Sequence, residues 1–163
     1  MRRSRKFKLF GEPGRMSCIL RIYGESLDIE ALMALYPLPF DRIWKKGEPR
    51  ILKGKFHSDS GANYLVSNAD IDEFDSQVLD ATKYLERYAP VIARMAEFPG
   101  VQNAILDFGF SFQEDSLAHF LFLPPKLVQL AASAGIGLEV SFYAYNKDSK
   151  KGHNPEFAPI SNS

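Results

Sequence analysis

The longest regular pattern of hydrophobic and polar positions runs from Phe74 to Phe98. Hydrophobic residues recur there at alternating steps of four and three, which is the spacing of one face of an α-helix. This pattern predicts one long amphipathic helix, in which Pro90 either makes a kink or begins a second helix in the same phase. The hydrophobic positions are Phe74, Val78, Ala81, Leu85, Tyr88, Ile92 and Met95.

Shorter segments on both sides of this helix have the patterns of strands and short helices. Most of the strand candidates alternate hydrophobic and polar residues, which is typical of a strand with one buried face. The predicted strands are residues 17–23, 42–45, 62–67, 104–112 and 138–145, and the predicted short helices are 27–36 and 124–134. The expected order along the chain is therefore β-α-β-β-α-β-α-β.

Strands that alternate this sharply leave one face of their sheet in contact with water. Such a pattern favours an antiparallel-rich sheet with helices packed on one face. We therefore predict the α+β class, as a ferredoxin-like sandwich with one added helix and strand. Residues 16–146 are expected to form a single domain, between a basic disordered arm (1–15) and a flexible polar tail (147–163). Met16 directly precedes the first predicted strand, so whether the arm belongs to the native protein is open.

Several short motifs resemble a known family. In residues 17–50, Leu27-Asp28 opens a short helix, and Trp44 precedes the turn Lys46-Gly47-Glu48. These features resemble the N-terminal half of the bacterial proteins grouped as domain of unknown function 4279. The later helix that Leu123-Pro124 opens, with the Gly-bounded strand after it, is similar to the end of that family. The resemblance covers about residues 17–145, implies a bacterial protein, and implies no known chemistry.

Composition narrows the possible function classes. The chain has 163 residues, a formal net charge of 0 and one cysteine, Cys18. The single cysteine excludes a disulfide or a cysteine cluster within one chain, and the zero net charge gives no overall attraction to nucleic acid or to an anionic membrane. No run of 18 apolar residues occurs, and no hydrophobic segment follows the basic start, so we expect a cytoplasmic protein with no membrane contact.

Motifs for catalysis or cofactor binding are missing from the sequence. The three histidines, His57, His119 and His153, stand far apart, and no metal-binding motif, phosphate-binding glycine loop or nucleophile elbow occurs. We therefore expect no cofactor, no metal and no enzymatic activity.

The outward face of the predicted strands is the first candidate binding surface. Tyrosines with mixed charges suit a protein interface, because they bury area at a low entropy cost and keep a polar tip. The alternative is an ordinary solvated face. The candidate residues are Arg21, Tyr23, Asp107, Glu139, Tyr143 and Tyr145, with Ser111 and Ser141 beside them.

The segment from Arg42 to Lys55 is the second candidate surface. Six cations surround one tryptophan there, so the segment has the composition to hold a phosphate or an acidic partner, with Trp44 as a stacking surface. The alternative is a solvated hairpin whose Trp44 packs on the core. The candidate residues are Trp44, Lys45, Lys46, Glu48 and Arg50.

These features lead to three hypotheses. The first is a non-enzymatic module that binds an unknown protein partner, of which an inhibitor or an immunity-like protein is one form. The second is nucleic-acid binding by the basic arm and the Arg42–Lys55 segment. The third is an enzyme that acts on an acidic or phosphorylated small molecule. The sequence names no partner and no oligomeric state.

Overall fold

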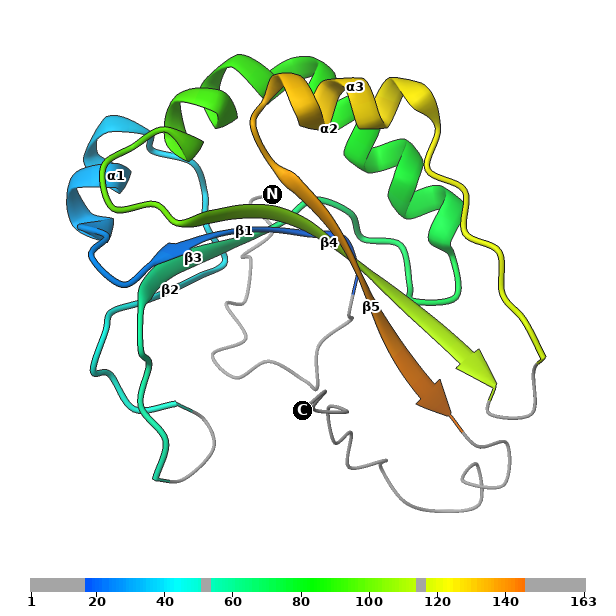
Figure 1. Cartoon of the computed structure of the whole chain (residues 1–163), viewed down its shortest axis with the longest axis horizontal. Coiled ribbons are helices and arrows are strands. Elements are labelled where there is room, and N and C mark those ends of the chain that lie inside the picture. Colours follow the sequence, from blue (N-terminus) through cyan, green and yellow to red (C-terminus); the bar gives the residue numbers. More distant parts are fainter. Residues whose placement is uncertain (1–16, 51–53, 114–116, 146–163) are drawn as a thin grey trace, which may run out of the picture.

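In the computed structural model, residues 17–50, 54–113 and 117–145 are described (Figure 1). The element order is β-α-β-β-α-β-α-β, as predicted, and each observed element overlaps its predicted range. The basic arm and the polar tail predicted at the two ends lie outside the described residues. The elements are β1 (Ile19–Gly24), α1 (Ile29–Leu35), β2 (Arg42–Trp44), β3 (Ser60–Leu65), α2 (Phe74–Ala96), β4 (Asn103–Gln113), α3 (Pro125–Ser133) and β5 (Gly137–Tyr145).

The strands form one mixed sheet in the order β2-β3-β1-β4-β5. β1 pairs antiparallel with both β3 and β4, β2 pairs antiparallel with β3, and β5 alone among the described strands runs parallel to its neighbour, β4. α1 connects β1 to β2, and this connection passes over β3. α2 connects β3 to β4, and this connection passes over β1. The predicted α+β class with an antiparallel-rich sheet is confirmed.

The helices lie together over one face of the sheet (Figure 1). Cys18, just before β1, and Leu20 and Ile22 within it turn toward them, and all three side chains are fully buried. The predicted stripe of α2 packs onto the same core, with Tyr88 only partly buried. The largest fully buried hydrophobic side chains are Phe108, Leu20, Ile22, Leu32, Leu85, Ile92, Met95, Leu106 and Leu127.

The hydrophobic pattern of α2 left two features of this helix undecided. Gln77 is fully buried, and its Nε2 donates hydrogen bonds to the carbonyl oxygens of Asp70 (2.8 Å) and Gly109 (2.9 Å). Gln77 therefore ties the start of α2 to β4. Pro90 lies inside one continuous helix, so it does not begin a second helix.

The helices in the described part of the chain are either too short or too polar to cross a membrane.

Pro90 gives a prediction about stability. Proline has no backbone N–H, so the carbonyl of Glu86 loses its helical donor, at a cost of about 3 kcal/mol in a helix interior. A proline also restricts the unfolded chain, and this effect stabilises the folded state by about 0.4–1 kcal/mol. We therefore expect Pro90→Ala to raise the free energy of unfolding by about 2 kcal/mol.

Urea unfolding followed by circular dichroism measures this difference. Lys83→Ala, at an exposed position of the same helix, is the matched control and should change the free energy of unfolding by less than about 0.5 kcal/mol. A Pro90→Ala variant no more stable than the wild type would show that α2 is already adapted to its proline.

Candidate functional site

Part of the second predicted surface, with Trp44, joins the first predicted surface in the folded chain. The strand register places Gly61 between Trp44 and Tyr23, and Asn63 between Arg42 and Arg21. Residues directly opposite each other in a sheet share a face, so β2 adds its side chains to the outward face of β1 and β3. We call this surface the open face, on which Ile19, Leu65 and Ile105 also lie; its polar and aromatic residues include Arg42, Trp44, Asn63, Arg21, Tyr23, Asp107, Glu139, Ser141 and Tyr143.

Gly61 allows Trp44 to lie close against the sheet. A Cβ atom at this position would lie 2.5 Å from Trp44 Cζ2 and 2.7 Å from the carbonyl oxygen of Ile22. Both distances are too short for any side chain, so the indole ring occupies the space above the glycine.

Neighbouring side chains fix the Trp44 ring on the open face. Trp44 Nε1 donates a 2.7 Å hydrogen bond to Asp59 Oδ1, and the ring stacks on His57 with 5.5 Å between centroids and 26° between planes. Trp44 is half-buried among polar groups. The alternative in which Trp44 packs on the core is therefore wrong.

A hollow of about 250 Å³ lies beside this tryptophan on the open face. Three arginines line it, Arg21, Arg42 and Arg50. The carboxylate of Asp59 is the acidic group in the lining. The remaining lining residues are Tyr23, Trp44, His57 and Asn63.

Arg21 connects the hollow to an ion-pair network on β4 and β5. Its Nη2 lies 2.6 Å from Glu139 Oε1 and 3.3 Å from Asp107 Oδ2. Ser141 Oγ donates a 2.8 Å hydrogen bond to Asp107 Oδ1. Burial raises the pKa of Asp107 above its ordinary value, and Glu139 raises it further, while Ser141 and Arg21 oppose the rise.

Tyr143 lies beside this network. Burial raises the pKa of its phenol, and the Asp107 carboxylate adds to the rise. Tyr145 ends β5, and its side chain lies outside the described residues. The structure thus brings five of the six strand residues together on one face, and their role in binding stays a prediction.

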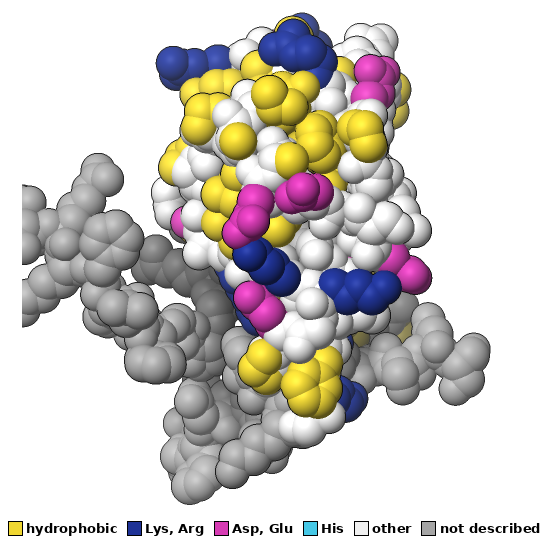
Figure 2. All heavy atoms as spheres, turned by 90° about the vertical axis from the view of Figure 1, so that its left-hand side faces the viewer, with side chains coloured by type: hydrophobic (Ala, Val, Ile, Leu, Met, Phe, Trp, Pro, Cys, Tyr) yellow, Lys and Arg dark blue, Asp and Glu magenta, His cyan; other side chains and the backbone are white. Residues whose placement is uncertain are grey.

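Lys45, Lys46 and Glu48 belong to the turn after β2 and do not line the hollow. Lys45 Nζ pairs with Glu30 of α1, whose hydrogen bond and charge raise the pKa of the lysine. Glu48 Oε2 accepts a 2.9 Å hydrogen bond from the Lys45 backbone N–H, so this carboxylate stabilises the turn. Figure 2, which views the side where α1 and β2 lie in Figure 1, shows acidic and basic side chains interspersed.

His57 and Asp59 were not predicted as site residues, because the sequence around them has the composition of a loop. The signal that could have identified them is the alternation His57, Asp59, Gly61 and Asn63, which continues the outward face of β3 toward the turn. An isolated antiparallel bridge between Pro49 and Phe56 pairs the start of this extension with the segment that follows β2.

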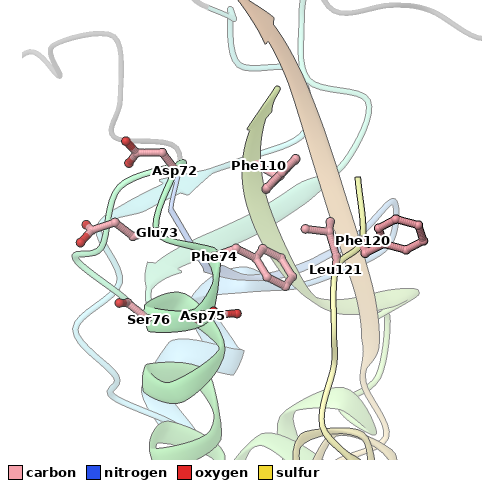
Figure 3. A pocket seen from close by; sticks show the side chains of 8 residues that line it. All are labelled: Asp72, Glu73, Phe74, Asp75, Ser76, Phe110, Phe120 and Leu121. Atoms are coloured by element: carbon pink, nitrogen blue, oxygen red, sulfur yellow. The ribbon is translucent and has the colours of Figure 1, made fainter. Parts of the chain in front are cut away.

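A second hollow, of about 330 Å³, lies at the start of α2 (Figure 3). Asp72 and Glu73 point away from the hydrophobic side chains in this view, so the acidic groups do not converge on one point. Phe120 is 95% exposed at its edge, in a run of sequence that fitted neither a strand nor a helix. The lining residues are Asp72, Glu73, Phe74, Asp75, Ser76, Phe110, Phe120 and Leu121.

Neither metal chemistry nor the comparisons with known proteins identify a function. Among residues 17–50, 54–113 and 117–145, no three His, Cys, Asp or Glu side chains are grouped closely enough to hold a metal ion. No family model, curated protein or solved structure gives a significant match to the chain. The resemblance to domain of unknown function 4279 stays a prediction.

The network around Asp107 gives the second prediction. Arg21 lowers the pKa of Asp107 and Glu139 raises it, so Arg21→Gln should raise this pKa further and Glu139→Gln should lower it. Titration of the Asp107 carboxyl ¹³C shift by NMR measures both changes. Lys126→Gln removes an ion pair with Glu86 on the helical side and should leave the Asp107 pKa unchanged. Shifts of the same sign in both open-face variants would contradict the network.

The raised pKa also predicts a pH dependence of stability. The folded chain holds the Asp107 proton more tightly than the unfolded chain, so this group favours folding below its ordinary pKa. The contribution is lost as pH rises through the raised pKa, and in Arg21→Gln the loss should extend to higher pH. Urea unfolding at a series of pH values measures it.

Proposed function

We propose that the chain is a protein-binding module without catalytic activity of its own, and that the open face is its interface. The observation that carries the proposal is that Trp44, from the second candidate surface, lies on the same face of the sheet as the first. Trp44 and the arginines of the β2 side continue directly into the network on β4 and β5. The helices lie on the other side of the sheet (Figure 1).

The residue types on the open face support a protein partner. Trp, Tyr and Arg dominate the binding energy of protein interfaces, because they combine a large contact area with a polar end. Trp44 is already held by Asp59, His57 and the space over Gly61. A side chain fixed before binding loses little conformational entropy when the complex forms.

The arrangement of nucleophiles and bases also supports binding over catalysis. In the described part of the chain, no hydrogen bond joins a serine or cysteine side chain to a histidine. Cys18 is fully buried, and burial raises its pKa well above the ordinary value, so its thiolate is disfavoured.

The charge distribution favours a protein over nucleic acid as the partner. Arg21 and Lys45 are paired with carboxylates of the same chain, which reduces the charge available to phosphates. Asp107 and Glu139 lie on the open face and would repel a phosphate backbone that crossed it. The basic arm of the nucleic-acid hypothesis lies outside the described residues.

Quantitative affinity capture from a lysate of the source organism, with matched variants, tests the proposal. We expect the wild type to retain one protein past about 0.5 M salt, where exposed ion pairs are largely screened. Tyr23→Ala and Tyr143→Ala should reduce its recovery by about tenfold or more, because aromatic anchors dominate interface energy. Leu79→Ala, at a half-exposed position of α2 on the helical side, should leave recovery unchanged.

Circular dichroism of each variant confirms that a loss of capture is not a loss of folding. Recovery that survives both tyrosine substitutions, or that falls only with Leu79→Ala, would place the interface elsewhere. Nucleic acid released at low salt, with no protein retained, would support the second hypothesis in place of the first.

A further inference from the structure

The hollow on the open face carries positive charge that the described residues do not neutralise. Arg21 is paired with Asp107 and Glu139, but neither Arg42 nor Arg50 makes an ion pair with a described carboxylate. Asp59 lines the same hollow without an ion pair to either arginine, and its single charge balances only one of the two; its Oδ1 accepts from Trp44 and its Oδ2 accepts from Ser58 Oγ at 3.3 Å. The hollow is therefore suited to an anion.

The size of the hollow limits what this anion can be. Its volume of about 250 Å³ is below the roughly 300–1,000 Å³ of pockets that enclose a small-molecule ligand. A single acidic side chain fits this space. The planar fork of an arginine matches the two oxygens of a carboxylate, and two arginines can hold one carboxylate between them.

We propose that the hollow receives a carboxylate from an acidic segment of a partner protein, held by Arg42 and Arg50 beside the Trp44–His57 stack. This inference rests on the proposed function and specifies the chemistry of the partner. The chain offers an internal precedent on the same face, where the guanidinium of Arg21 is paired with two carboxylates. The stacked rings provide a flat wall against which the apolar stem of a Glu or a neighbouring side chain packs.

The neighbourhood favours one or two carboxylates over a long polyphosphate. Asp107 and Glu139 lie on the next strands of the same face, so a continuous polyanion that left the hollow in that direction would meet like charge. In an extended peptide successive side chains point to opposite sides, so even a short all-glutamate segment presents only one or two carboxylates to the hollow.

Trp44 is the single tryptophan of the chain and lines the hollow, so its fluorescence and its indole N–H NMR signal report on the site directly. The probe is a hexaglutamate peptide with blocked ends, and a hexaglutamine peptide of the same length is its neutral counterpart. Inorganic phosphate and a short oligothymidylate test the phosphate alternatives.

We expect hexaglutamate, and not hexaglutamine, to shift both Trp44 signals, with an affinity that falls as salt is added. Arg42→Gln and Arg50→Gln should each weaken this binding by about tenfold or more, since each removes a charge-assisted contact. Lys83→Gln removes the same charge from an exposed position on α2 and should bind hexaglutamate like the wild type. Both arginines are exposed, so the variants should fold.

Equal binding of hexaglutamate by the wild type and both arginine variants, or no binding at all, would overturn the proposal. Tighter binding of phosphate or oligothymidylate that depends on Arg42 would overturn the carboxylate assignment. The same experiments distinguish a failure of this inference from a failure of the proposed function. If hexaglutamate binds through Arg42 and Arg50 but no protein is captured, the anion site is supported and the proposed function is not. If a partner is captured through Tyr23 and hexaglutamate does not bind, the function stands and this inference fails.

Discussion

The packing of α2 on the inner face of the sheet is the interaction on which the rest of the structure depends. The sheet turns Leu20, Leu106 and Phe108 to one side, and α2 covers them with a stripe that includes Leu85 and Ile92, all fully buried. Burial of each such side chain stabilises the fold by about 1.5–3 kcal/mol. Because α2 also connects β3 to β4, the same packing holds the two strands between which β1 lies.

The open face follows from this one-sided arrangement. With the helices on one side, the other side of the strands carries polar and aromatic residues together with Ile19, Leu65 and Ile105. The register of the strands decides which of them are neighbours. The β4–β5 half is acidic, because Asp107 and Glu139 set two carboxylates against the one guanidinium of Arg21 from β1. The β2–β3 half carries Arg42 and Arg50 with Trp44, so the face is polarised and its two halves suit different parts of a partner.

The sequence was most informative where the signal is local. Alternation along single segments predicted the strands, and it correctly placed Arg21, Asp107 and Glu139 on one face, because side chains in a strand alternate with a period of two. Trp44 lies on that face because it pairs with Gly61. This register joins residues that are far apart in the sequence, so no pattern within a single segment contains it. His57 was missed because the sequence around it has the composition of a loop, and the ring on which it stacks, Trp44, belongs to β2.

The position of β1 in the sheet has a consequence for how the chain folds. Ile19 pairs with Leu65 on one side and with Asp107 on the other, so the central strand finds its neighbours far along the chain. Closing such long loops costs entropy before the contacts that compensate it form, and folding slows accordingly. During synthesis β1 leaves the ribosome before β3, α2 and β4 are made, so the hydrophobic side of Leu20 and Ile22 stays uncovered until α2 follows.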